Sequence, residues 1–188
     1  MTTIYFIRHA EPNYNNPDDF SRELTQKGLQ SCKDLVNLFS QIHLDAFYSS
    51  PYIRALETIK PLAEHRRKTI HRVDDFRERK ITDHWIEDFA DFTEKQWADF
   101  NYRLPGGESL SQVQERNIRA LETILQEHPD QTIVIGTHGT ALSTIINYYN
   151  PEFLLADFQR IKHIFPWVIA CEFQGLSCRS IIEIGTDF

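Results

Sequence analysis

The sequence predicts an α/β fold: a three-layer sandwich in which a largely parallel central sheet lies between two layers of helices. Short runs of β-forming residues alternate along the chain with longer segments whose apolar residues recur at helical spacing. Parallel strands joined by crossover helices must be covered on both faces. The chain of 188 residues is 41% hydrophobic and shows no internal repeat or linker, so we expect a single domain over residues 1–188.

The first half of the chain contains two strand and helix units. Residues 4–7, Ile-Tyr-Phe-Ile, form a short apolar run typical of a strand that is buried on both faces. After a loop rich in Asn, Pro and Asp, apolar residues recur at helical spacing from residue 29 to 42, behind the candidate cap Thr25. Residues 46–48 then predict a second strand, and Pro51 suits the first turn of the helix that follows.

The second half continues the alternation. Ser109 and Gln112 have the spacing of a capping box, which predicts the start of a long helix reaching about residue 125. Residues 132–136 form the clearest strand of the sequence, and a helix is expected from about 140 to 148. The β-rich stretch 168–184 closes the fold.

Charge and cysteine content narrow the classes of partner. The net charge is −7 and no Lys/Arg-rich run occurs, which argues against nucleic acid and membrane surfaces as partners. The N-terminal apolar run is too short for a signal sequence or a membrane span. Cys32, Cys171 and Cys178 are widely spaced with no CxxC pair, as expected of reduced thiols. We therefore expect a cytoplasmic protein, and the sequence leaves its oligomeric state open, a dimer included.

Polar residues suited to phosphate chemistry follow three predicted strands. Arg8 and His9 come after the first, Arg54 lies just beyond the second, and His138 and Gly139 follow the strongest. Ligand sites of such sheets lie at the carboxyl ends of the strands, so these residues should meet at one edge. Arginine forks hold the equatorial oxygens of a transferring phosphoryl group, and a helix start adds backbone N–H groups.

The residue types at this edge suggest roles in phosphoryl transfer. A neutral ring nitrogen of His9 can attack phosphorus if the other ring nitrogen is held as a donor, for example by a backbone carbonyl. The departing alcohol needs an acid, for which Glu78 is the candidate. A lone glutamate among charged neighbours, as Glu78 is, is more often surface charge. The other histidines show no metal-ligand spacing, and neither metal nor cofactor is expected.

With these residues in place, the sequence resembles the phosphoglycerate mutase-like branch of the histidine phosphatase superfamily. Residues 7–11 are similar to the RHG signature of the family, with Ala10 in place of Gly, and Asn15 matches a phosphate-contacting Asn. Residues 24–28 resemble its LTxxG element, 49–58 its SSPxxRAxxT element, 105–109 its PGGES element, and 137–139 its SHG element. The resemblance runs in order over about residues 4–148, which is more specific than any single motif.

The resemblance implies a phosphoglycerate mutase-like fold and a phosphohistidine intermediate at His9. It also implies a phosphate pocket formed by Arg8, Arg54 and His138, with Asn15 and Gly139 as further binding residues. The match at the acid is the weakest, because the residues that follow it in the family are replaced here. Either Glu78 or Glu108 could thus be the proton donor.

Three functions compete on these grounds. The leading one is a metal-independent phosphatase acting on small phosphomonoesters, with a small phosphorylated metabolite as partner. The second is a phosphoglycerate mutase primed by a bisphosphate, although the chain looks short for that branch and lacks a basic insertion. The third is an inactive module that binds a phosphorylated ligand.

A segment rich in aromatic and acidic residues, 85–102, is the most distinctive part of the chain, and we expect a cap insertion at about residues 80–104. An aromatic stripe at helical spacing favours an amphipathic helix packed on the core. The hypothesis is that this segment also roofs the active site and selects substrate. Being acidic, it should disfavour substrates that carry several phosphates.

Overall fold

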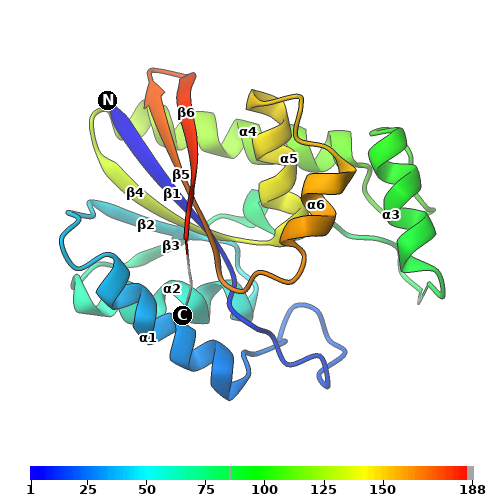
Figure 1. Ribbon diagram of the computed structural model, residues 1–188, viewed down its shortest axis with the longest axis horizontal. Coiled ribbons are helices and arrows are strands. Elements are labelled where there is room, and N and C mark those ends of the chain that lie inside the picture. The colour runs from blue at the N-terminus through cyan, green and yellow to red at the C-terminus, as the bar shows by residue number, and fades with distance from the viewer. Residues whose placement is uncertain (85, 186–188) are drawn as a thin grey trace.

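A six-stranded mixed sheet forms the centre of the computed structural model, which describes residues 1–84 and 86–185 (Figure 1). The strands lie in the order β3-β2-β4-β1-β5-β6. Their bounds are β1 Thr2–Arg8, β2 Ala46–Ser49, β3 Ile70–Arg72, β4 Thr132–Thr137, β5 Trp167–Gln174 and β6 Ser177–Ile184. The first four strands are parallel to one another, while β5 runs antiparallel to β1 and to β6. The expected largely parallel sheet is confirmed, with an antiparallel pair at one edge.

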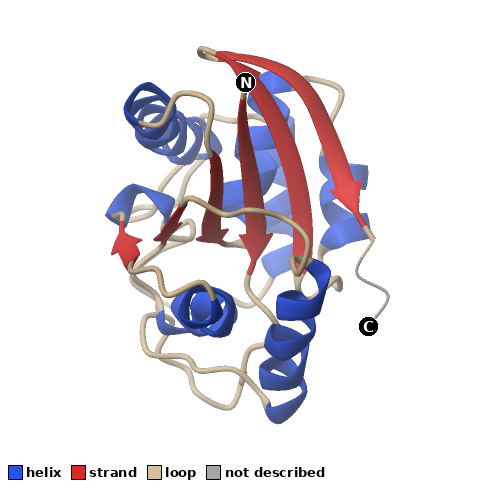
Figure 2. Ribbon diagram, turned by 90° about the vertical axis from the view of Figure 1, so that its left-hand side faces the viewer, coloured by secondary structure: helices blue, strands red, loops and turns tan. Residues whose placement is uncertain are grey.

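Helices cover both faces of the sheet (Figure 2), which confirms the three-layer architecture. One face carries α1 (Gln26–Leu38) and α2 (Ile53–His65), and the other carries α4 (Leu110–Glu127), α5 (Gly139–Tyr149) and α6 (Leu155–Ile161). Side chains of a strand point alternately to the two faces. On β4, Ile133 and Ile135 therefore join the core beneath α4 and α5, whereas Val134 joins the core beneath α1 and α2. Apolar side chains on both faces explain why this strand reads as an uninterrupted hydrophobic run.

The helix starts largely follow the sequence signals. Thr25 caps α1 by accepting from the Gly28 N–H at 3.0 Å, and the capping box at Ser109 is formed. The prediction that Pro51 lies in the first turn of α2 is wrong, because that helix begins at Ile53. Tyr52 is extended, and its N–H is bonded to Ser50 Oγ, so the chain makes a short bend between β2 and α2.

The segment rich in aromatic and acidic residues contains the helix α3 (Phe89–Ala98). Phe92 and Trp97 are buried, whereas Phe89 is half exposed. Trp97 packs against Phe158 of α6, with ring centroids 5.5 Å apart. The amphipathic helix expected here is present, while its role as a roof stays a prediction. Trp85, the first residue of that segment, lies outside the described residues.

Several short elements gave no usable sequence signal. They are β3, a single 3-10 turn η1 (Asp74–Phe76) and α6. The first two lead the chain to Glu78, and the last carbonyls of α6 contact Arg8. In the part of the chain that the structure describes, no helix is long and apolar enough to cross a membrane. Cys32, Cys171 and Cys178 are free thiols.

Candidate active site

Three parallel strands end at the same edge of the sheet and bring the predicted residues together. The register of β1 on β4 pairs Arg8 with Thr137, and that of β2 on β4 pairs Ser49 with Gly136. Main-chain bonds continue past the strand ends: the His9 N–H donates to Thr137 O at 3.0 Å and the Ser50 N–H to Gly136 O at 2.9 Å. The residues that follow β1, β2 and β4 therefore form one site, as expected for the carboxyl edge of such a sheet.

His9 is buried and held in one tautomer. Its Nδ1 lies 2.8 Å from the carbonyl oxygen of Ala10, which can only accept, so Nδ1 carries the proton and Nε2 is left bare. The pKa of His9 is well below its usual value of 6.5, mainly because the ring is buried and further because Arg54 and Arg8 lie close. The imidazole is therefore neutral at physiological pH, the form in which a ring nitrogen can act as a nucleophile.

Arg8 is fixed by the C-terminal end of α6. Its Nη1 donates to Ile161 O at 2.7 Å and to Ile164 O at 3.3 Å, and its Nη2 donates to Lys162 O at 3.1 Å. Burial lowers the pKa of Arg8 to about 10, which leaves the group cationic at neutral pH. Its Nε is buried and has no hydrogen-bond partner among the described residues. The Nε–H group of Arg8 can thus donate to a bound ligand, while Nη1 and Nη2 are held by backbone carbonyls.

Phe165 and Gly139 enclose the Arg8 guanidinium. The ring of Phe165 lies 4.0 Å from Arg8 Cζ and is stacked on the His9 ring at 5.7 Å between centroids. Gly139 opens α5, and a Cβ there would lie 3.1 Å from Arg8 Nε and 3.2 Å from its Cζ. The predicted binding residue Gly139 therefore acts here by leaving room for Arg8.

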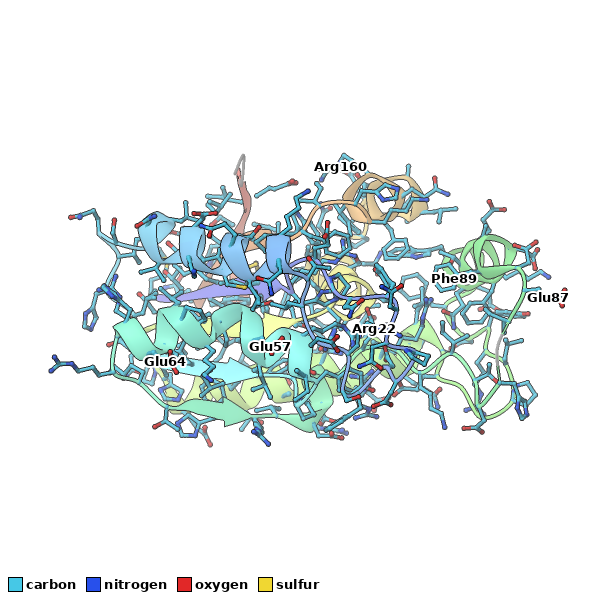
Figure 3. All side chains as sticks on the ribbon, turned by 90° about the horizontal axis from the view of Figure 1, so that it is seen from below. Arg22, Glu57, Glu64, Glu87, Phe89 and Arg160 are labelled. Atoms are coloured by element: carbon cyan, nitrogen blue, oxygen red, sulfur yellow. The ribbon has the colours of Figure 1, made fainter. Side chains whose placement is uncertain are left out.

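Arg54 comes from the first turn of α2 and is held by the loop after β1. Its Nη2 lies 3.1 Å from the Asp19 carboxylate, and its Nη1 donates to the backbone carbonyl of the same residue. Asp19 also pairs with Arg22 at 3.0 Å. Along the long axis in Figure 3, Arg22 lies between Glu57 of α2 and Phe89 of α3.

His138 is fully buried beside His9, with ring centroids 5.4 Å apart. Its Nε2 lies 2.7 Å from Ser50 Oγ, and its Nδ1 is buried with no partner among the described residues. Burial, with Arg54 and His9 as further causes, lowers the pKa of His138 well below 6.5. Both histidines of the site are thus uncharged, and the positive charge resides on the arginines.

Glu78 lies at the N-terminus of α5. Its carboxylate accepts from the backbone N–H groups of Thr140 and Ala141, both at 3.1 Å, and from that of Arg79 at 2.8 Å. The charge of Glu78 raises the pKa values of both Arg8 and Arg54, although burial lowers them by more. The structure therefore brings Glu78, which follows Arg54 by about 24 residues, close to Arg8 and Arg54.

Glu108, the reserve candidate, is engaged in a separate network. Its carboxylate accepts from Arg116 at 2.8 and 3.0 Å, from Arg77 at 3.1 Å and from the Lys80 N–H at 3.0 Å. These partners hold the pKa of Glu108 below its usual value, against the opposing and largest effect of burial. Arg116 also donates to the carbonyls of residues 75, 77 and 78. This network fixes the segment that presents Glu78 and occupies the Glu108 carboxylate with Arg116, Arg77 and the Lys80 N–H.

Asn15 is the one predicted residue that the structure leaves at the margin. It is exposed, and its backbone N–H donates to Asn13 Oδ1 at 3.1 Å. Within residues 1–84 and 86–185, no hydrogen bond links its side chain to the pocket. Among those same residues, no group of three or more His, Cys, Asp or Glu side chains could hold a metal ion.

Sequence reasoning missed four residues that shape the site: Ser50, Phe165, Asp19 and Arg116. Ser50 lay inside a recognised motif, so its proximity to a strand end was a usable signal. Phe165 and Arg116 carry no local signal, because only the tertiary fold brings them to Arg8 and Glu78.

A buried neutral histidine close to two arginines, with a carboxylate at a nearby helix start, is the arrangement of a phosphoryl-transfer site of the histidine phosphatase type. The family model of the histidine phosphatase superfamily, branch 1, matches residues 4–174. The chain belongs to this family, and it is a hydrolase of phosphate monoesters.

Individual relatives agree with the family match. The chain is 27% identical over 155 residues to phosphoserine phosphatase 1 of Hydrogenobacter thermophilus, covering 73% of this chain and 71% of that protein. It is 28% identical over 164 residues to a metal-independent phosphoserine phosphatase of Arabidopsis thaliana, covering 77% and 67%. The solved structure of YhfR from Bacillus stearothermophilus superposes with a TM-score of 0.77 at 26% identity over 95% of each chain.

A further structure supports the fold alone. A mutant phosphoserine phosphatase of Entamoeba histolytica, in complex with phosphoserine, superposes with a TM-score of 0.80 at 22% identity, covering 100% of this chain and 98% of that one. The helical layers and the sheet thus match a phosphoglycerate mutase-like architecture, as the sequence resemblance implied.

Proposed function

We propose that the protein hydrolyses small phosphomonoesters in two steps through a phosphohistidine at His9. The observation that carries the proposal is the state of this residue: Nδ1 is held by the Ala10 carbonyl, and burial beside Arg8 and Arg54 keeps the ring neutral. Nε2 is then the only ring nitrogen with a free lone pair. In the first step it attacks phosphorus, the ester P–O bond breaks, and the alcohol leaves.

The charge of the phosphoryl group is met by Arg8, Arg54 and His138. In the transition state negative charge is spread over equatorial oxygens, and fixed donors in a buried site stabilise it strongly. Arg8 contributes its buried Nε, and its anchorage by α6 and Phe165 prevents it from moving during the reaction. Arg54 adds a second cation, and its pairing with Asp19 must loosen if its terminal nitrogens are to bind phosphate.

Glu78 supplies the proton chemistry in this proposal. As an acid it gives its proton to the departing alkoxide, and as a carboxylate it then takes a proton from the water that attacks the phosphohistidine. Its three backbone partners at the start of α5 fix its position during both steps. Phosphate and regenerated His9 complete the cycle.

The substrate that we propose is a small phosphorylated metabolite of the phosphoserine kind. Support comes from the relatives, since two of those described above are phosphoserine phosphatases by name. The exposed acidic residues of α3 and its two ends outnumber the single cation Lys95, and this excess of negative charge favours a substrate with a single phosphate. They are Asp88, Asp91, Glu94 and Asp99. Faster hydrolysis of an inositol polyphosphate than of monophosphate esters would refute this role of α3.

Hydrolysis of p-nitrophenyl phosphate and of phosphoserine in excess EDTA tests the proposal. We compare native protein, His9→Ala and, as a matched control, a variant at the exposed His163, His163→Ala. Activity should survive the chelator, vanish in His9→Ala and persist in His163→Ala. Unaltered activity of His9→Ala would refute the mechanism.

The same samples address the two alternatives raised by the sequence. Isomerisation of 3-phosphoglycerate in the presence of a bisphosphate primer would support a mutase. Phosphate binding without turnover by the native protein would support an inactive binding module.

A further inference from the structure

The hydroxyl of Ser50 faces a buried ring nitrogen of the phosphate pocket. Ser50 is fully buried, and its Oγ lies 2.7 Å from His138 Nε2. The same Oγ accepts the backbone N–H of Tyr52 at 3.2 Å. Ser50 follows β2, whereas His138 follows β4, so this contact joins two neighbouring strand ends.

The hydrogen bonds around Ser50 restrict where its proton can go. A hydroxyl has one proton to donate and can accept two bonds. Tyr52 occupies one accepting direction, and among the described residues the only atom bonded to Ser50 Oγ that can accept is His138 Nε2. If Nε2 carried a proton instead, Ser50 Oγ would accept twice and its own proton would be buried without a partner, which is costly.

The protonation of Nε2 decides whether the other ring nitrogen of His138, Nδ1, carries a proton. Nδ1 is buried with no partner among the described residues, in a ring that makes an edge contact with His9. A bare Nδ1 would repel phosphate oxygens, whereas a protonated Nδ1 would donate to them. Because the ring is buried among cationic groups and is neutral, it carries a single proton, and the two nitrogens cannot both be donors.

We infer that Ser50 is a positioning residue: its hydroxyl donates to His138 Nε2 and thereby fixes the Nδ1–H tautomer, which makes Nδ1 a donor to the substrate phosphate. This inference rests on the proposed function of the site and adds a residue to it. Ser50 acts through His138 and does not touch the substrate. The bond from Tyr52 holds the hydroxyl oxygen in place, so the donor direction is set by the bend between β2 and α2.

The test compares Ser50→Ala with Ser49→Ala. Ser49 is equally buried, but its hydroxyl donates to the carbonyl of Ser50 at 2.8 Å and not to a ring. We expect Ser50→Ala to lower kcat/KM for p-nitrophenyl phosphate roughly 10- to 100-fold and to weaken inhibition by vanadate. This is less than the roughly 100- to 1,000-fold loss seen when a fixed donor is removed outright, because the variant keeps the His138 ring and part of its Nδ1–H form. Ser49→Ala should stay within about threefold of native.

A spectroscopic measurement separates tautomer control from a merely structural role. Long-range proton–nitrogen correlation spectra of the native protein should show His138 as the Nδ1–H tautomer, and spectra of Ser50→Ala should show a mixture or the Nε2–H form. An Nε2–H tautomer in the native protein, or an unchanged tautomer in Ser50→Ala, would overturn the inference. The spectra do not depend on turnover. Activity in His9→Ala would therefore refute the proposed function separately.

Discussion

Replacing Gly139 with Ala should impair catalysis without unfolding the protein. The new Cβ would lie 3.1 Å from Arg8 Nε and 3.2 Å from both Cζ and Nη2. Those contacts are shorter than carbon atoms normally accept, so the guanidinium would have to move by a few tenths of an ångström. It cannot do so freely, because three carbonyls of the α6 end and the Phe165 ring hold it.

The size of the effect follows from the role of Arg8. Misplacement of a catalytic group by about 1 Å can cost on the order of 100-fold in rate, so a shift of a few tenths should cost about tenfold, or about 1.4 kcal/mol. Stability should change little. Alanine is favoured over glycine in a helix by up to about 1 kcal/mol, which offsets the strain at Arg8.

The assay is kcat/KM for p-nitrophenyl phosphate, measured with the melting temperature of the same samples. Gly185→Ala is the control, since a Cβ at residue 185 would meet no atom of the described residues within 4 Å, its chain neighbours aside. Gly139→Ala should lose about tenfold in kcat/KM at a nearly native melting temperature. If its kcat/KM stays within twofold of native, the close packing of this glycine on Arg8 does not control catalysis and the reasoning is refuted.

Three further predictions concern the proposed acid Glu78, the ring of Phe165 and the pH dependence of stability. Glu78→Gln should lower kcat by roughly 100-fold or more at native stability. Glu108→Gln should instead lower the free energy of unfolding by about 2 kcal/mol and leave kcat within about threefold. Enzyme kinetics and urea denaturation of both variants test this, and the reverse pattern would exchange the roles of the two glutamates. Phe165→Ala should lower kcat/KM about tenfold through loss of the cation–π contact and stacking, while Phe165→Tyr should retain most activity; equal activity of the two would contradict this. Since the folded state lowers the pKa values of His9 and His138, the unfolded chain binds more protons, so stability should fall as pH drops below about 6.5 and be level above it. Denaturant unfolding at pH 7.5 and 5.5 measures the loss of unfolding free energy between the two pH values. The loss should be smaller in a His138→Gln variant than in the native protein, and equal losses would contradict the assignment.

The strands that carry the site could be predicted because their patterns are local. Ile133, Val134 and Ile135 place apolar side chains on both faces of the sheet, and this is the condition of a central parallel strand. The polar residues directly after such strands must lie at one sheet edge, so Arg8, His9 and His138 could be grouped before the structure was known. The capping box at Ser109 is equally local, because its two bonds link residues three apart.

The boundary of α2 shows where a local signal misleads. Proline suits the first turn of a helix, yet Pro51 precedes the helix because the chain must bend after β2 and Tyr52 is bonded to Ser50 Oγ. The choice between Glu78 and Glu108 was also beyond local patterns. Both are glutamates near arginines in the sequence. Only the packing of α4 places Glu108 against Arg116 and Glu78 at the start of α5.

The sequence by itself determined the α/β class, the order of the central elements and the meeting of Arg8, His9 and His138 at one sheet edge, since each depends on periodicity or on position relative to a strand end. Only the tertiary structure decided how those residues are held. Arg8 is fixed by carbonyls at the end of α6 and by the ring of Phe165, and the carbonyl of Ile161 lies 153 residues further along the chain. Ser50 contacts His138 across 88 residues. Such contacts leave no periodic trace, because a hydrogen bond or a ring contact needs only proximity in space, and proximity is set by the packing of the whole chain.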